Sequence, residues 1–180
     1  MTLLQDEQEY AVIALVLQLH FVSDRHPRLL LRAQVADPSA RLRYVDYAKF
    51  AGLPHARGEA KRTYREEEGD WILKNRNDPR QLDPAHPALA GHDVLSEDDY
   101  ADVFDRQNGI PAAWQRFHER YPDRGGLVGV SRVGFDTERL RALVQASRTS
   151  GGLSGYGLEF HLSFTGEGWA ITRGKMAWIS

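Results

Sequence analysis

The sequence predicts an α+β fold in which N-terminal helices pack on a C-terminal antiparallel sheet. Helical apolar spacing, capping residues and charge-rich segments dominate residues 1–124, whereas residues 125–180 contain four stretches of β-forming residues separated by turn residues. Helices followed by strands, and not alternating with them, are typical of segregated α+β domains. We therefore expect one domain over residues 1–180, with one or two short strands in its helical layer.

The helical layer is expected to begin with a helix from Asp6 to about residue 22. Asp6 and Glu9 resemble a capping box, and the apolar residues that follow recur at helical spacing. A strand is expected after Pro27, and a second short apolar stretch lies at 92–95. Further helices are predicted over residues 37–52, 59–77, 96–109 and 111–121.

The C-terminal part is expected to form a consecutive meander of four antiparallel strands. Its four stretches cover residues 126–136, 139–150, 157–168 and 169–180, and short turns join the first pair and the last pair. We expect the helices to cover one face of this meander. The residues predicted for the core are Trp114, Phe117, Val128, Val130, Phe135, Leu143, Phe160 and Trp178.

Composition excludes several functional classes. The chain has no cysteine, which rules out disulfides, thiolate catalysis and cysteine-ligated zinc. A net charge of −2 and the lack of a recognition motif argue against nucleic acid as a partner, although residues 106–180 carry ten basic and only six acidic side chains. The apolar run 11–17 follows acidic residues and is too short to span a bilayer, so we expect a cytoplasmic protein without a membrane partner.

Several short patterns together resemble an uncharacterised bacterial protein family. They are SRVGF at 131–135, GGLSGYG at 151–157, the closing WIS, the pair Lys74–Asn75 and the aromatic helix ending in FHERYP. The resemblance covers about the last two-thirds of the chain. Family members generally carry cysteines where this chain has Ser150 and Ser154, so a disulfide or thiol role there is absent here. The resemblance implies the architecture and no activity.

The glycine-rich stretch 149–161 meets none of the phosphate or nucleophile motifs. Position 160 is Phe where a dinucleotide fingerprint needs glycine, no Lys–Ser pair follows Gly157, and Tyr156 stands where a nucleophile elbow needs glycine. We expect its glycines to shape a β–β connection, with positive φ at several of them, and we predict no cofactor.

Basic and polar side chains near this loop suggest a binding site. Arginines on consecutive strands beside glycine N–H groups can cradle an anion, although the same arginines would also suit a solvated sheet face. The predicted ligand-binding residues are Arg132, Arg148, Ser150, Ser154, His161 and Arg173.

We expect a non-catalytic binding or interaction protein with a small anionic ligand or a protein partner at the sheet and loop. The alternative is a hydrolase that uses Ser154, His161 and Glu159, or a histidine-bound metal. No metal site is predicted, because the acidic and histidine residues between 83 and 93 lack helical ligand spacing. Enzymatic activity and oligomeric state stay open.

Overall fold

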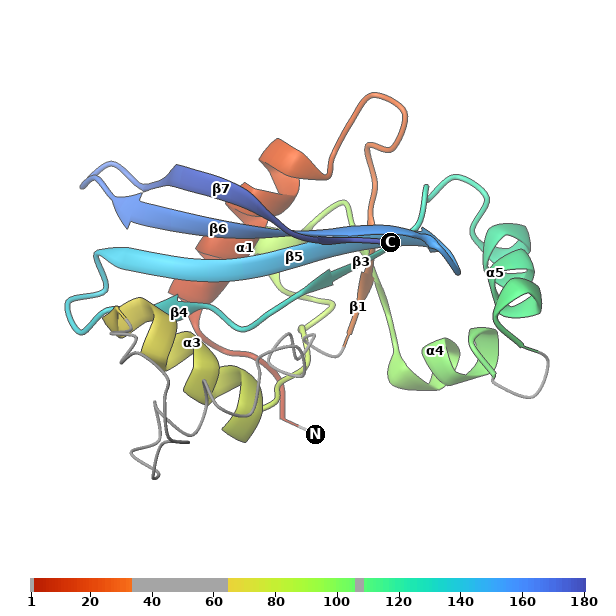
Figure 1. The fold of residues 1–180 in the computed structure, drawn as a ribbon, viewed down its shortest axis with the longest axis horizontal. Helices are drawn as coiled ribbons and strands as arrows, with labels where there is room; N and C mark the ends of the chain where they lie inside the picture. Colours follow the sequence, from red (N-terminus) through yellow and green to blue (C-terminus); the bar gives the residue numbers. More distant parts are fainter. Residues whose placement is uncertain (1, 34–64, 106–108) are drawn as a thin grey trace, which may run out of the picture.

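The computed structural model describes residues 2–33, 65–105 and 109–180, and the helix predicted over residues 37–52 lies outside this part. The described elements confirm the α+β class, with four α-helices and a seven-stranded, mostly antiparallel sheet (Figure 1). The helices are α1 (Glu7–His20), α3 (Glu66–Asn77), the 3₁₀ turn η2 (Pro87–Leu89), α4 (Glu97–Val103) and α5 (Gly109–Arg120). The strands are β1 (Leu30–Arg32), β2 (Asp93–Leu95), β3 (Leu127–Val130), β4 (Gly134–Phe135), β5 (Arg141–Gly151), β6 (Ser154–Phe164) and β7 (Trp169–Ile179).

Local signals explain where α1 and α4 begin. The Asp6 carboxylate accepts hydrogen bonds from the backbone N–H groups of Gln8 and Glu9, at 3.0 and 3.2 Å, and so caps α1. Ser96 caps α4 in the same way, and its hydroxyl also bonds the side chain of Asp99. The end predicted for the helix over residues 96–109 is wrong. α4 stops at Val103, and Gly109 is instead the first residue of α5, with a φ of 76°.

The sheet extends the predicted meander by two parallel strands. β3, β5, β6 and β7 pair antiparallel in the expected order, and β1 and β2 add to the β3 edge. The first predicted strand is interrupted at residues 131–133, so that β3 and β4 pair separately with β5.

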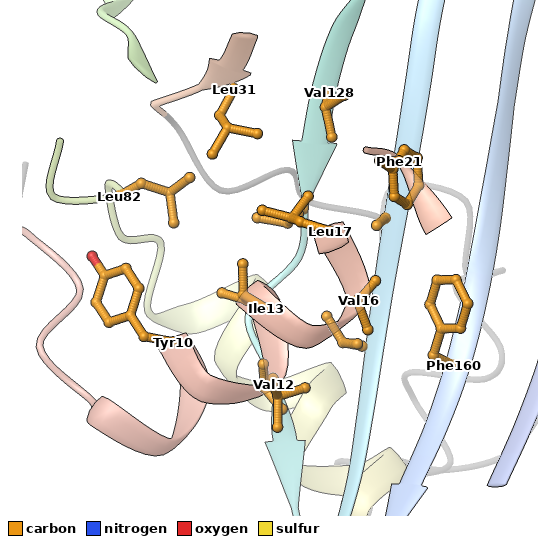
Figure 2. Close-up of a cluster of buried hydrophobic side chains, with 14 of the residues drawn as sticks. Tyr10, Val12, Ile13, Val16, Leu17, Phe21, Leu31, Leu82, Val128 and Phe160 are labelled. Atoms are coloured by element: carbon orange, nitrogen blue, oxygen red, sulfur yellow. The ribbon is translucent and has the colours of Figure 1, made fainter. Parts of the chain in front are cut away.

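Helices cover both faces of the sheet, which corrects the prediction of one covered face. Alternate residues of a strand point to opposite faces. Val128 of β3 packs in the cluster with α1, whereas its neighbour Leu127 packs with Phe117 of α5. Figure 2 shows the α1 cluster, where Val16 and Leu17 lie beside Val128 and Phe160. Apolar side chains of both faces are therefore removed from water.

The predicted core is confirmed for six of its eight residues. Phe117, Val128, Val130, Phe135, Leu143 and Phe160 are buried. Trp114 and Trp178 are partly exposed. Each of these two tryptophans lies at the end of the sheet where the glycine-rich hairpin turns.

Candidate functional site

The glycine-rich stretch forms a tight hairpin at one end of the sheet. β5 ends at Gly151 and β6 begins at Ser154, so only residues 152 and 153 lie between the strands. Several of the four glycines from 151 to 157 were expected to have a positive φ. None of them does, so this part of the prediction is wrong. A β-carbon on Gly157 would instead lie 2.0 Å from Nε1 of Trp178, so glycine here makes room for the indole.

The hairpin borders a small hollow of about 230 Å³ on the α1 side of the sheet. We call it the Arg148 hollow. It is lined by Arg148, Ser150, Ser154, Gly155, Tyr156, Ile179 and Ser180. The structure thus brings together three of the six predicted ligand-binding residues, because Arg148 pairs with Tyr156 across the strands and Ser150 and Ser154 flank the turn.

Arg148 has few protein partners for its guanidinium. One hydrogen bond of 2.7 Å runs from Nη2 to the backbone oxygen of Phe21, and no carboxylate among the described residues pairs with it. Its Nε is buried without a hydrogen-bond partner. A guanidinium has five N–H donors, so most of its donors are available to a further acceptor.

The two serines of the hollow hydrogen-bond each other. Their Oγ atoms lie 3.0 Å apart, and the Ser150 carbonyl accepts from Nε2 of His118 on α5 at 3.0 Å. Both hydroxyls can rotate toward a ligand, since a hydroxyl donates or accepts equally well.

Arg132 lies elsewhere, in the interior between α1 and α3. Its guanidinium donates to both oxygens of Glu9, at 2.7 and 2.9 Å, and to Asp78 at 2.9 Å. Arg132 is 6% exposed and Glu9 is fully buried. Burial lowers the pKa of Arg132, but the hydrogen bonds and charges of Glu9 and Asp78 outweigh it and raise the pKa above its ordinary value. The structure therefore does not bring Arg132 to the hollow, and the donors of its guanidinium are bonded to Glu9 and Asp78.

The neighbours of Arg132 complete a polar network that joins α3 to the break between β3 and β4. Asn75 exchanges hydrogen bonds with the backbone of Arg132, and Lys74 donates to the Val133 oxygen. Trp71 donates from Nε1 to the Ser131 hydroxyl at 2.9 Å. The patterns at 74–75 and 131–135 that carry the family resemblance thus have a structural role in this chain.

His161 and Glu159 lie on the α5 side of the sheet, away from the hollow. Glu159 accepts from His161 at 3.2 Å, from Gln145 at 2.9 Å and from Lys175 at 2.6 Å. Burial raises the pKa of Glu159, but Lys175, Gln145 and His161 together outweigh it and hold the pKa below its ordinary value. Arg173 is exposed on the edge strand β7, opposite His161 in the ladder.

Of the three residues of the hydrolase alternative, Glu159 and His161 meet but Ser154 lies apart from them. Ser154 and His161 are seven residues apart on the same extended strand, which separates them by roughly 20 Å. The Ser154 hydroxyl is bonded to that of Ser150, and among the described residues no basic side chain hydrogen-bonds it. In the described ranges, no group of three His, Asp or Glu side chains converges to hold a metal ion.

Sequence reasoning missed a larger cavity on the other face of the same end of the sheet. This cavity, the α5 pocket, has a volume of about 630 Å³ and lies between α5, the end of α4 and strands β3 and β5. Gly129 and Ser147, which face each other across β3 and β5, were the available signal, because two small residues on one sheet face leave space above them. Reading that signal requires the strand register, which the sequence does not specify.

Comparison with known protein families, with curated proteins and with solved structures found no match. The family resemblance therefore stays a prediction. Within the described parts of the chain, no helix has the length and apolar character needed to cross a membrane.

Proposed function

We propose that this protein is a non-catalytic binding protein that takes a small anion, such as a phosphate or carboxylate group, in the Arg148 hollow. The observation that carries the proposal is Arg148, a part-buried arginine with one hydrogen bond and no carboxylate partner in the described structure. Burying a charge without a partner is costly, and an anion would supply the missing counter-charge.

The hollow suits a small group more than a protein segment. Its volume of about 230 Å³ matches a few heavy atoms. Its polar lining includes the guanidinium of Arg148 and the side chains of Ser150, Ser154, Tyr156 and Ser180. A charge-assisted hydrogen bond contributes about 1.5–3 kcal/mol. Two of them support a Kd of about 1 mM for inorganic phosphate. This geometry favours an anion over the predicted protein partner, and the separation of Ser154 from His161 disfavours the hydrolase alternative.

A titration with inorganic phosphate tests the proposal. We expect saturable shifts of the backbone amide signals of residues 148–156 in the wild-type protein, and their loss in Arg148→Gln. The matched control is Arg173→Gln, which removes an exposed arginine from the same sheet and should leave the titration unchanged. Equal responses of the two variants, or shifts spread over the whole surface, would contradict the proposed site.

A further inference from the structure

We infer that the α5 pocket is a second binding site, for a flat, uncharged aromatic molecule that carries a hydrogen-bonding group. This inference goes beyond the proposed anion site, because the two sites lie on opposite faces of the sheet and use different chemistry. It depends on four features of the pocket: its floor, its walls, its charge and its size.

The floor is a patch of sheet without large side chains. Gly129 pairs with Ser147 and Leu127 pairs with Thr149, and all four residues line the pocket. The hydroxyls of Ser147 and Thr149 make no hydrogen bond to any residue that the structure describes. Hydroxyls on the floor of a mainly apolar cavity provide donors and acceptors for a ligand that carries a carbonyl or hydroxyl group.

The walls are aromatic and come from the end of α4 and from α5. The ring of Phe104 lies 4.8 Å from that of Tyr100 and 5.0 Å from that of Trp114, the latter at an interplanar angle of 74°. Ile110, at the rim, is 64% exposed. Rings arranged edge to face accept a further flat ring by offset stacking, which contributes about 0.5–1.5 kcal/mol per ring pair beyond apolar burial.

Charged residues of both signs, Arg32 and Asp105, line the pocket, which disfavours an ionic ligand. Arg32 stacks on Tyr100, with its guanidinium carbon 4.2 Å from the ring centroid, and pairs with Glu97 at 3.3 Å. An anion would compete with Glu97 for Arg32 and would meet the charge of Asp105, whereas a cation would meet the charge of Arg32. An uncharged ligand avoids both repulsions.

The size fits a molecule of one to three fused or linked rings. Ligand pockets typically enclose about 300–1,000 Å³, and the α5 pocket, at about 630 Å³, lies within this range. A protein segment would instead need a longer groove than one bounded by α5, the end of α4 and two strands.

The experiment uses the neutral dye N-phenyl-1-naphthylamine and the full chain. We expect saturable fluorescence enhancement in the wild-type protein and at least ten-fold weaker binding in Ser147→Phe, in which a ring fills the pocket from its floor. The control is Ser163→Phe, at a part-buried serine on the same sheet face outside the pocket, which should bind as the wild type does. Circular dichroism verifies that each variant is folded.

A second variant covers the case in which Ser147→Phe does not fold. Ile110→Ser changes an exposed rim residue and should weaken dye binding several-fold without affecting the fold. The inference is overturned if the wild type shows no saturable binding, or if the folded pocket variants bind the dye as tightly as Ser163→Phe. We expect phosphate not to displace the dye. The dye experiment therefore tests the α5 pocket alone, and the phosphate titration tests the Arg148 hollow alone.

Discussion

The buried pair of Glu9 and Arg132 shows how one side chain can anchor three elements. Both oxygens of Glu9 accept from Arg132, and one also accepts from the backbone N–H of Val133. Lys74 of α3 lies 3.4 Å from the same carboxylate. Donors from α3 and from the break between β3 and β4 thus take the place of the water molecules that the carboxylate loses when it is buried.

We predict that Arg132→Met lowers the free energy of unfolding by about 3–5 kcal/mol, because it leaves the buried Glu9 carboxylate without its main partner. Urea denaturation measures the change. Arg25→Met, at an exposed position outside the sheet, is the control and should change stability by less than about 0.5 kcal/mol. A loss below 1 kcal/mol in Arg132→Met would show that the pair is not a structural anchor.

A second prediction concerns the glycine under Trp178. Gly157→Ala should destabilise the protein by about 1–3 kcal/mol, because the new methyl group overlaps the indole and forces β6 and β7 to shift. Gly174→Ala is the matched control on β7, where a β-carbon would lie 3.6 Å from the Phe160 ring, an ordinary contact. Thermal unfolding of the two variants compares them directly, and equal melting temperatures would refute the steric role of Gly157.

The residue types showed which side chains could bind an anion, but not where the fold places those side chains. Arg132 and Arg148 look alike in the sequence, each in a β-rich stretch, yet one bonds two carboxylates and the other bonds one backbone oxygen. The difference arises from strand register and from α1, whose Glu9 meets Arg132 across a sequence separation of 123 residues. No local pattern encodes such a contact.

Strand β7 forms one edge of the sheet and is long for an exposed edge. It contains eleven residues, including the exposed apolar side chains of Met176 and Ile179. Its ladder with β6 is irregular at two places, beside Gly157 and beside His161, and Arg173 and Lys175 lie between these irregularities. Bulges and positive charges are common means of preventing edge-to-edge pairing.

We predict that Arg173→Val increases self-association, since it replaces a charge on the free edge with a β-branched apolar side chain. Light scattering over a range of protein concentrations should show a larger mean mass than for the wild type. Arg25→Val, at an exposed position outside the sheet, should not change the mass. Unchanged scattering by Arg173→Val would mean that the bulges protect the edge without the charge.

Elements with strong local signals were predictable and those without them were not. α1, α3, α5 and the meander followed from caps, apolar spacing and turn residues. The parallel pairing of β1 with β2 and β3 was missed, because β1 and β2 have three residues each and lie more than sixty residues apart. The break at residues 131–133 was also missed, since it depends on hydrogen bonds from α3 and α1 and not on a turn residue.

The whole molecule should lose stability in acid. Burial raises the pKa of Asp6, Asp136 and Glu159, but hydrogen bonds and neighbouring cations outweigh it and hold each pKa below its ordinary value. A carboxylate with a lowered pKa in the folded state stabilises the fold fully above its unfolded pKa, near 4 for these groups, and loses that contribution as the pH falls through the folded value. The melting temperature should therefore fall steadily below about pH 4.

Asp136→Asn gives the matched comparison for this pH dependence. The variant should be less stable than the wild type at pH 7, because it weakens the bonds that the carboxylate accepts from Leu140 and Arg141. The difference between the two proteins should narrow on acidification. A constant difference from pH 7 to pH 3 would show that Asp136 does not contribute to the acid sensitivity.

The sequence separation of Glu9 and Arg132 has a consequence for the order in which the chain assembles. The hairpins β5–β6 and β6–β7 join neighbouring segments and need only short loops to close, so they can form early. Glu9 has no such local partner, and its counter-charge emerges from the ribosome 123 residues later. During synthesis Lys74 becomes available first, but the bidentate partner of Glu9 is missing until the β3–β4 region is made. We therefore expect the first helix of the chain to be among the last elements to reach its final position.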